Sequence, residues 1–235
     1  MELVSVNVGL PREVTYGTRT YPTSIFKHPV AGRVRVGRLN LAGDRQGNPQ
    51  THGGPDMAVY VYSRDHYAFW EKDLGAGPLS CGAFGENLTV TGMADHEVFI
   101  GDEFCIGSAR FQVTEPRTPC HKLAMKFDDP NLPRRFFKSG RLGFYFRVLD
   151  EGDVGAGDEI TCEARDPAGL TIAEIAGIWA DKGAGRRALE RALKVDALSE
   201  NWRKAFETRL ESAAAAGPGT RARTREWSES KLAWV

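Results

Sequence analysis

The sequence of 235 residues lacks an apolar run long enough to cross a membrane. Its longest apolar runs, such as residues 57–62, fall far short of the roughly 18 residues that a span requires. It also lacks net charge, with 31 Lys and Arg against 31 Asp and Glu, so no overall field attracts it to nucleic acid or anionic lipid. The first residues show neither the basic nor the apolar region of a signal peptide. We expect a cytoplasmic protein with no membrane and no nucleic-acid partner, although a local basic patch is compatible with this balance.

Cysteine is scarce and shows no regular spacing. The four cysteines, at positions 81, 105, 120 and 162, form no C-x-x-C pair, and without a secretory leader they do not indicate a disulfide scaffold. Neither the cysteines nor the five scattered histidines match an iron–sulfur or zinc ligand set. The glycine-rich motifs of dinucleotide and P-loop sites and the G-x-S-x-G of serine hydrolases are missing too. At most one cysteine is therefore expected to be chemically active.

Short segments rich in β-branched and aromatic residues dominate the chain up to about residue 163. Glycine, proline and aspartate separate them, as in an antiparallel barrel or sandwich. Two of the segments follow a Gly-Asp pair, at 101–102 and 157–158, which is typical of a tight turn at a strand entry. We predict a mainly β, barrel-like fold with a few short helices, one of them over 63–72. The predicted strands lie over 3–8, 34–39, 57–62, 97–100, 103–106, 110–114, 143–149 and 158–162.

Helical periodicity replaces this pattern after residue 163. Thr171 and Glu174 form a capping box, and apolar residues then recur at intervals of three and four. Ser199 is a second N-cap candidate, ahead of Trp202, Phe206 and Leu210 at successive i+4 steps. We predict three domains or segments: a β-barrel over 1–163, a three-helix domain over 164–212 and a mobile tail over 213–235.

Chemically active side chains are densest in residues 115–123. Two prolines stiffen this loop. Cys120 lies close to Arg117 and Lys122, and positive neighbours favour the thiolate that a nucleophile or a soft metal ligand needs. A structural cysteine in a proline-rich turn is the alternative.

Two glycine-rich stretches, 40–47 and 51–56, carry further polar side chains, and residues 84–88 form a similar Gly-Glu-Asn turn. Backbone in such loops can approach a ligand closely, and the Gly53-Gly54 pair can present N–H groups to an anion. Each stretch alone is more typical of an ordinary turn.

Together these segments resemble the MOSC family, named for the C-terminal domain of molybdenum cofactor sulfurases, and within it the YiiM-like proteins. The resemblance rests on residues 24–30, 43–46, 52–59 with Tyr62, 84–88 and 116–120, in the same order and spacing, and it extends over roughly residues 5–212. The three-helix region is also a YiiM-like feature. His121 departs from the family pattern, so the resemblance gives it no role.

The resemblance implies a MOSC β-barrel that holds molybdenum cofactor (Mo-molybdopterin), with Cys120 as the thiolate ligand of molybdenum. Asp44 and His52 are then candidates for orienting groups or proton donors near the metal. The candidate cofactor-binding residues are Lys27, Asn40, Gln46, Gly53, Gly54, Asn87, Arg117 and Lys122.

The resemblance also implies a reaction, the reduction of N-hydroxylated substrates such as hydroxylaminopurine bases. Because the chain has no flavin, nicotinamide or iron–sulfur motif, electrons are expected from a separate reductase or ferredoxin-like protein. The three helices would dock that donor or cover the barrel. Three alternatives stay open: a non-enzymatic carrier of the cofactor or of persulfide sulfur, a metal-free cysteine hydrolase that uses Cys120 with His52 or His121, and an adaptor that acts through the helices and tail.

Overall fold

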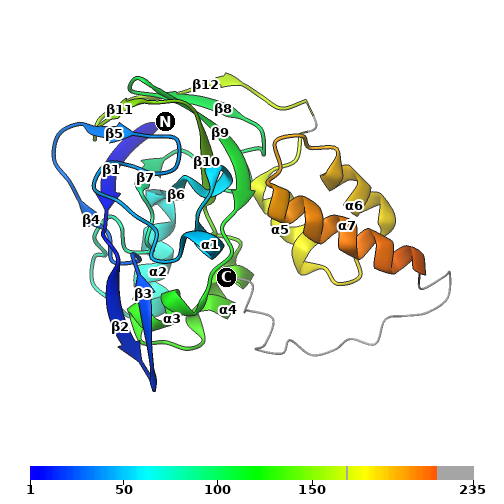
Figure 1. Ribbon diagram of the computed structural model, residues 1–235, viewed down its shortest axis with the longest axis horizontal. Coiled ribbons are helices and arrows are strands. Elements are labelled where there is room, and N and C mark those ends of the chain that lie inside the picture. The colour runs from blue at the N-terminus through cyan, green and yellow to red at the C-terminus, as the bar shows by residue number, and fades with distance from the viewer. Residues whose placement is uncertain (168, 216–235) are drawn as a thin grey trace.

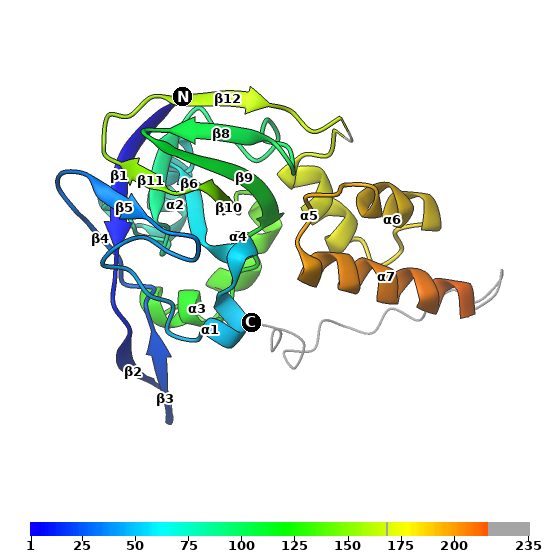
Figure 2. The ribbon, with the colours of Figure 1, turned by 45° about the horizontal axis from the view of Figure 1, so that its top comes forward.

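The structure, a computed structural model, describes residues 1–167 and 169–215 (Figure 1). A curved sheet with its surrounding segments forms the N-terminal part, and three helices lie beside it (Figures 1 and 2). The predicted mobile tail over 213–235 begins inside a helix that continues to Ala215. The rest of that tail, 216–235, lies outside the described residues.

Strands and helices alternate along the first part of the chain. The strands are β1 (Glu2–Val8), β2 (Arg12–Tyr16), β3 (Arg19–Thr23), β4 (His28–Pro29), β5 (Val34–Val36), β6 (Val59–Ser63), β7 (Leu88–Thr91), β8 (Glu103–Ile106), β9 (Ala109–Pro116), β10 (Phe144–Asp150), β11 (Gly152–Val154) and β12 (Ile160–Ala164). The helices are α1 (Pro49–His52), α2 (Tyr67–Leu74), α3 (His121–Phe127), α4 (Leu132–Ser139), α5 (Ile172–Ala180), α6 (Arg186–Leu193) and α7 (Glu200–Ala215), with short 3-10 turns η1 (Pro55–Met57) and η2 (Arg64–His66).

The main sheet has eight strands in the order β12-β8-β9-β10-β6-β7-β1-β4. Its neighbours pair antiparallel, except that β6 and β7 run parallel. Alternating burial along β10 places Phe144, Phe146 and Val148 on the buried face, as the period of two in a strand requires. β5 pairs with β11 and β2 pairs with β3 in two smaller sheets.

The prediction of a mainly β barrel is wrong in two respects. The sheet is mixed and is not a closed barrel: within residues 1–167 and 169–215, no strand ladder joins its outer strands β4 and β12. The start of β1 meets residues 157–160 through an isolated bridge, Glu2 with Glu159, and through backbone hydrogen bonds of Met1 and Leu3. Helices also occupy about as much of the chain as strands do. Closure depends on tilt and register between distant strands, which local composition does not encode.

Most predicted elements formed, with shifted ends. The predicted strand over 103–106 is β8, and Gly101 ahead of it has a φ of +93°, which a tight turn at that place requires. The predicted strand over 97–100 is wrong, since Phe99 makes only an isolated bridge. The predicted helix over 63–72 is confirmed as η2 and α2, and the Ser63 side chain accepts a hydrogen bond from the N–H of Asp65. The hairpin β2–β3 and helices α3 and α4 are absent from the prediction.

Three helices, α5, α6 and α7, form the C-terminal part as predicted. Both arms of the Thr171–Glu174 capping box are present. Ser199 accepts a hydrogen bond from the N–H of Trp202 at 3.4 Å, which confirms it as an N-cap. Side chains from these helices, Leu189 and Phe206 among them, belong to the same buried cluster as the inner face of the sheet, so sheet and helices share one core.

A second, aromatic core lies on the other side of the sheet. Trp70 of α2 stacks on Phe136 of α4 with ring centroids 4.9 Å apart, and Tyr62 and Phe84 pack beside them. Such ring pairs stabilise a core beyond their buried area. This cluster supports the cavity described below, because Phe84 also lines it.

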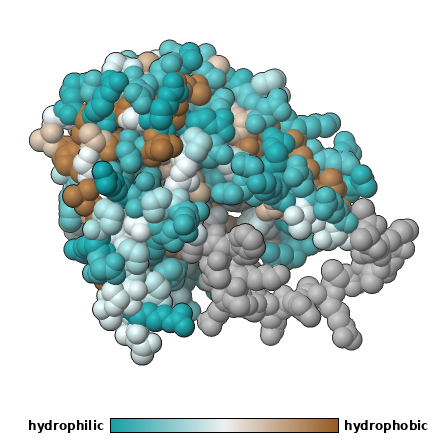
Figure 3. Space-filling model, viewed as in Figure 1, coloured by the Kyte–Doolittle hydropathy of each residue, from teal (hydrophilic) through white to brown (hydrophobic). Residues whose placement is uncertain are grey.

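On the face drawn in Figure 3, apolar side chains occur in groups among polar ones. None of the described helices combines the length and the hydropathy that crossing a membrane would require.

Candidate cofactor site

A cavity of about 100 Å³ lies where segments distant in sequence meet. It receives side chains from the loop after β3, from the loops at 44–47 and 84–87, from β6 and β10, and from the segment between β9 and α3. Most of the predicted site residues line it: Lys27, Asp44, Gln46, His52, Asn87, Arg117, Cys120 and Lys122. The fold therefore brings these eight residues together.

Three predicted site residues do not line this cavity. The carbonyl of Asn40 accepts a hydrogen bond from the N–H of Gly37 at 2.9 Å within a turn. Gly53 ends α1 so close to Pro49 that a Cβ atom would collide with its carbonyl oxygen, and Gly54 has a φ of +95°. These contacts shape loops, and a role for the three residues in cofactor binding stays a prediction.

Cys120 occupies the position directly before α3 and is 4% exposed. Its carbonyl accepts a hydrogen bond from the N–H of Leu123 at 3.0 Å, which fixes the backbone at the start of the helix. Lys122 lines the same cavity, and burial lowers the pKa of its ammonium group against the opposing influence of Cys120. One wall of the cavity thus carries a thiol and a half-buried amine.

Arg117 is a buried cation, and no carboxylate among residues 1–167 and 169–215 forms an ion pair with it. Its side chain lies over the rings of Tyr60 and Phe136, 5.1 Å from each centroid, and the residue is 6% exposed. Its Nη1 atom has no hydrogen-bond partner. A buried, unsatisfied guanidinium is costly unless a ligand or ordered water completes its bonds. The arrangement therefore favours a bound anion or polar group at this point.

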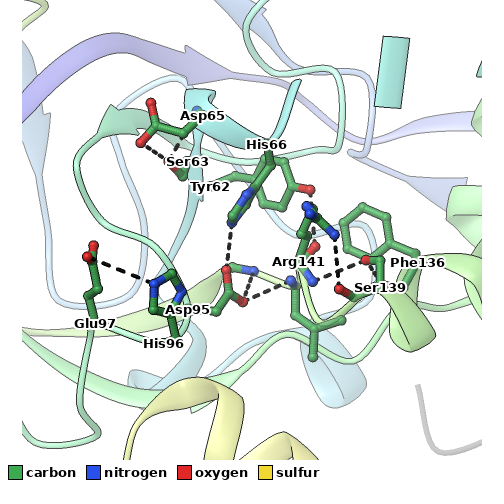
Figure 4. Close-up of polar contacts among 12 residues, drawn as sticks. Tyr62, Ser63, Asp65, His66, Asp95, His96, Glu97, Phe136, Ser139 and Arg141 are labelled. Atoms are coloured by element: carbon green, nitrogen blue, oxygen red, sulfur yellow. Dashed lines mark hydrogen bonds and ion pairs between the residues drawn. The ribbon is translucent and has the colours of Figure 1, made fainter. Parts of the chain in front are cut away.

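The loop that holds Arg117 is fixed by Asp95 (Figure 4). Asp95 accepts hydrogen bonds from the N–H groups of Leu142 and Gly143, both at 2.9 Å, and its other oxygen lies 2.8 Å from Nε2 of His66. The carbonyl of Gly143 in turn accepts a hydrogen bond from the N–H of Arg117 at 3.1 Å. The buried carboxylate therefore positions the backbone of the site, a role that the sequence did not reveal.

Asp44 organises the opposite wall. One carboxylate oxygen accepts hydrogen bonds from Lys27 and from the N–H of Gly9 at 2.8 Å, and the other accepts from Nδ2 of Asn87 at 2.9 Å. The side chains of Lys27 and Asp44 are only 8% and 3% exposed. Burial lowers the pKa of Lys27, and the adjacent Asp44 opposes that shift. These contacts are those of a positioning residue, and proton donation by Asp44 stays a prediction.

His52 is held in the neutral form. Burial, followed by the positive charges of Lys122, Arg117 and His121, lowers the pKa of His52 to about 3. Its Nε2 atom has no hydrogen-bond partner. His52 would therefore bind a ligand as an uncharged hydrogen-bonding group. The positive charge of the cavity comes from Lys122 and Arg117.

Glu86 is a buried carboxyl group that the sequence analysis placed in a plain turn. It is fully buried and accepts hydrogen bonds from the hydroxyl of Tyr67 and from the N–H groups of Gly82, at 2.8 Å, and Phe84, at 3.0 Å. Burial lowers the pKa of nearby Lys126 to about 8, and the charge of Glu86 opposes the shift. The hydrogen bonds that Glu86 accepts fix the turn that leads to Asn87.

Other cavity residues were missed as well. Ser24, Tyr60 and Tyr145 line the cavity, and the hydroxyl oxygen of Ser24 has no partner. Tyr60 and Tyr145 are direct neighbours in the β6–β10 pairing, with ring centroids 5.3 Å apart. Only the strand register brings them together, so no local motif could have identified them.

Sequence comparisons agree with this architecture. The MOSC domain model matches residues 48–161, and the model of the YiiM-like 3-alpha helix domain matches residues 170–213. YflK from Bacillus subtilis is 42% identical over 204 residues, which cover 87% of this chain and 92% of YflK. YiiM from Escherichia coli is 33% identical over 190 residues, which cover 80% of this chain and 84% of YiiM. A protein named reductase from Gibberella moniliformis is 37% identical over 142 residues, which cover 59% of this chain and 25% of that protein.

The fold is shared with a solved structure of the same kind. The crystal structure of YiiM from Geobacillus stearothermophilus superposes with a TM-score of 0.76 at 37% identity, covering 89% of this chain and 98% of that one. The similarity thus includes both the sheet with its cavity and the three helices. The chain belongs to the MOSC family, as a YiiM-like member with the C-terminal 3-alpha helix domain.

Proposed function

We propose that this protein is a molybdenum-cofactor-dependent reductase of N-hydroxylated compounds. The observation that carries the proposal is the buried Arg117, whose Nη1 atom lacks a partner in the cavity that Cys120 also lines. MOSC domains are associated with molybdenum cofactor in general, and one relative carries the name reductase. Both the chemistry of the cavity and the family therefore support a redox cofactor here.

The residues present fit an anionic cofactor that brings most of its own metal ligands. Among the described residues, no group of three or more His, Cys, Asp or Glu could hold a metal ion. Cys120 would therefore supply one soft sulfur ligand, and the pterin dithiolene would supply others. Arg117 and Lys122 would bind the negative charge, and the free Ser24 hydroxyl would bind a polar edge.

The proposed reaction converts R–NHOH to R–NH₂ and water, and it consumes two electrons and two protons. When bound, the cofactor supplies the two-electron chemistry. The electrons would come from a separate reductase or ferredoxin-like protein. Neutral His52, with a free Nε2 atom, would pass a proton by exchanging tautomers, because its lowered pKa disfavours a second ring proton. The carboxylate of Asp44 instead keeps Lys27 and Asn87 in place.

Cofactor content tests the proposal directly. Protein from cells that synthesise the cofactor should contain molybdenum and pterin in nearly equal amounts to the polypeptide. Cys120→Ala should remove the metal without changing the melting temperature. Cys162→Ala is the matched control, because Cys162 is exposed on β12. A folded wild-type protein without metal or pterin would refute the proposal, and metal retained by Cys120→Ala would assign the ligand to another residue.

Turnover separates an enzyme from a carrier. The loaded protein should reduce 6-hydroxylaminopurine with dithionite-reduced methyl viologen as the artificial donor. Bound cofactor without reduction of any N-hydroxylated compound would favour the alternative, a carrier of the cofactor or of persulfide sulfur. The cofactor should also protect Cys120 from alkylation, whereas a metal-free hydrolase would show a thiol that reacts equally in all preparations.

A further inference from the structure

The junction between the sheet and the three helices is built around strand β9. Figures 1 and 2 show the helices beside this strand. The backbone N–H of Ser199, the residue before α7, donates a hydrogen bond to the carbonyl of Thr114 at 3.2 Å. The hydroxyl of Thr114 donates a hydrogen bond to the carbonyl of Asp56 at 2.7 Å. One strand therefore contacts both the start of α7 and the short turn η1.

Asp56 of η1 joins the helices to the cavity wall through its side chain. One carboxylate oxygen accepts hydrogen bonds from Nη2 and Nε of Arg147 on β10, at 2.6 and 2.9 Å. The other oxygen accepts a hydrogen bond from the N–H of Glu200, the first residue of α7, at 3.2 Å. Met57 and His52, which lie on either side of Asp56 in the chain, line the cofactor cavity. The cavity wall is thus bonded to the helices through one carboxylate.

Glu115 is enclosed in the same junction. It is 5% exposed, and its Oε2 atom has no hydrogen-bond partner. Ser199 donates a hydrogen bond to it, the negative charge of Asp56 acts on it, and Tyr145 is its partner in the pairing with β10. Within residues 1–167 and 169–215, no basic side chain forms an ion pair with Glu115, and Arg147 on β10 is paired with Asp56. Burial raises the pKa of Glu115 to about 8, so the group is protonated in the closed junction at neutral pH.

The proton on Glu115 and the closed junction depend on each other. Ionised Glu115 would keep a buried carboxylate oxygen without a partner, near the second carboxylate of Asp56, and such a charge is costly. Water can compensate the charge when the start of α7 moves away from β9. That movement would separate the N–H of Glu200 from Asp56 and so release η1.

We propose that Asp56 is a positioning residue that couples the three helices to the cofactor cavity, and that loss of the proton from Glu115 opens this coupling. With Glu115 protonated, α7 holds Asp56, and η1 keeps Met57 and His52 at the cavity. With Glu115 ionised, the start of α7 separates from β9 and the cavity wall loosens. The position of the helices is therefore transmitted to the site, whichever group the cavity binds.

Alkylation of Cys120 tests the coupling in the full-length, cofactor-free protein. Iodoacetamide is the probe, and peptide mass spectrometry gives the reaction rate of buried Cys120 relative to exposed Cys162 in the same chain. Glu115→Gln keeps the shape of the protonated side chain and cannot ionise. The wild-type rate divided by the variant rate should therefore rise at least fivefold from pH 6 to pH 8. Comparing the two proteins at equal pH cancels the titration of the thiols.

Two further variants separate coupling from a general effect of charge. Asp56→Asn replaces the acceptor of Glu200 and Arg147, so it should speed alkylation of Cys120 at least threefold at both pH values. Glu207→Gln is the matched control, because it neutralises an exposed carboxylate of α7, and its rate should stay within twofold of the wild type. A rate ratio for Glu115→Gln that rises less than fivefold, or an unchanged rate in Asp56→Asn, would overturn the proposal.

Hydrogen exchange shows whether the junction opens by itself. The N–H groups of Ser199 and Glu200 bond across the junction, and at pH 8 they should exchange at least tenfold faster than the N–H groups of β7, which lies farther along the sheet. In Glu115→Gln this difference should shrink. Equal exchange at the two places in the wild type would mean that the junction opens only when the whole chain unfolds, and the proposal would then be wrong.

Discussion

The backbone N–H of Arg117 donates a hydrogen bond to the carbonyl of Gly143 at 3.1 Å. This bond connects the loop that carries the buried guanidinium to a loop that Asp95 fixes through two backbone hydrogen bonds. A Cβ atom at Gly143 would collide with the carbonyl oxygen of Val61, and the residue has a φ of +68°, so glycine is required here. The site therefore depends on residues that never contact a ligand.

Replacing Asp95 should affect both stability and the site. Asp95→Ala leaves two buried N–H groups and His66 without their acceptor, so the free energy of unfolding should fall by about 3 kcal/mol. Urea unfolding measures this change, and cofactor content should fall because Arg117 loses its fixed position. Glu97→Ala, at an exposed neighbour, should stay within about 0.5 kcal/mol of the wild type. Similar losses in both variants would contradict the positioning role of Asp95.

Arg117→Met should separate stability from binding. Removing a buried cation without a counterion should leave the cofactor-free protein as stable as the wild type or up to about 2 kcal/mol more stable. Cofactor retention should nevertheless fall at least tenfold, because the anion loses its charged partner. Thermal unfolding and pterin analysis of the same samples provide both readouts. A large loss of stability without a loss of cofactor would show that Arg117 is only a structural residue.

The buried pair Lys27–Asp44 should show strong coupling. Either Lys27→Met or Asp44→Asn alone leaves one buried partner uncompensated and should cost about 3 to 5 kcal/mol of unfolding free energy. The double variant should lose clearly less than the sum of the two single losses. A double-mutant cycle by urea unfolding measures this coupling. Additive losses would mean that the two side chains contribute independently.

Glu115 should make stability depend on pH. It lies where the sheet meets the three helices, and burial raises the pKa of its carboxyl from 4.5 to about 8, opposed by a hydrogen bond from Ser199 and reinforced by Asp56. Between these values the folded state binds a proton at Glu115 that the unfolded state has released, so the contribution of Glu115 to the free energy of unfolding should fall as pH rises from about 4.5 to 8.

Glu115→Gln tests this dependence. The variant should gain stability relative to the wild type as pH rises through that window, by at most about 1.4 kcal/mol per pH unit. Urea unfolding at half-unit steps from pH 5 to 9 measures the free energy of unfolding of both proteins. Subtracting the two values cancels the contribution of Lys126, which is common to both. A difference that does not vary with pH would place the pKa of the folded-state carboxyl near its ordinary value.

Local patterns were reliable where one short segment determines the outcome. The capping box at Thr171 and Glu174 and the cap at Ser199 depend on neighbouring residues, and the strand at 103–106 pairs with β9, which follows it directly. Each formed as predicted. The predicted strand over 97–100 did not form, because its backbone N–H and carbonyl groups bond to turns and to the segment before α5. The β propensity of a segment does not make it a strand unless a partner strand is available to pair with it.

The sequence alone determined the three C-terminal helices, the resemblance to the MOSC family and the importance of the stiff, cationic loop around Cys120, because each is a matter of residue types at short spacing. Tertiary structure decided that the sheet is mixed and open. It also decided that the carboxylate of Asp44 accepts hydrogen bonds from Lys27 and Asn87, and that Arg117 has no counterion among the described residues. It further decided that His52 and His121 line a second pocket beside the cavity. Burial and pairing arise from contacts between residues far apart in the chain, and these contacts, rather than composition, determine which charges are compensated and which are left for a ligand.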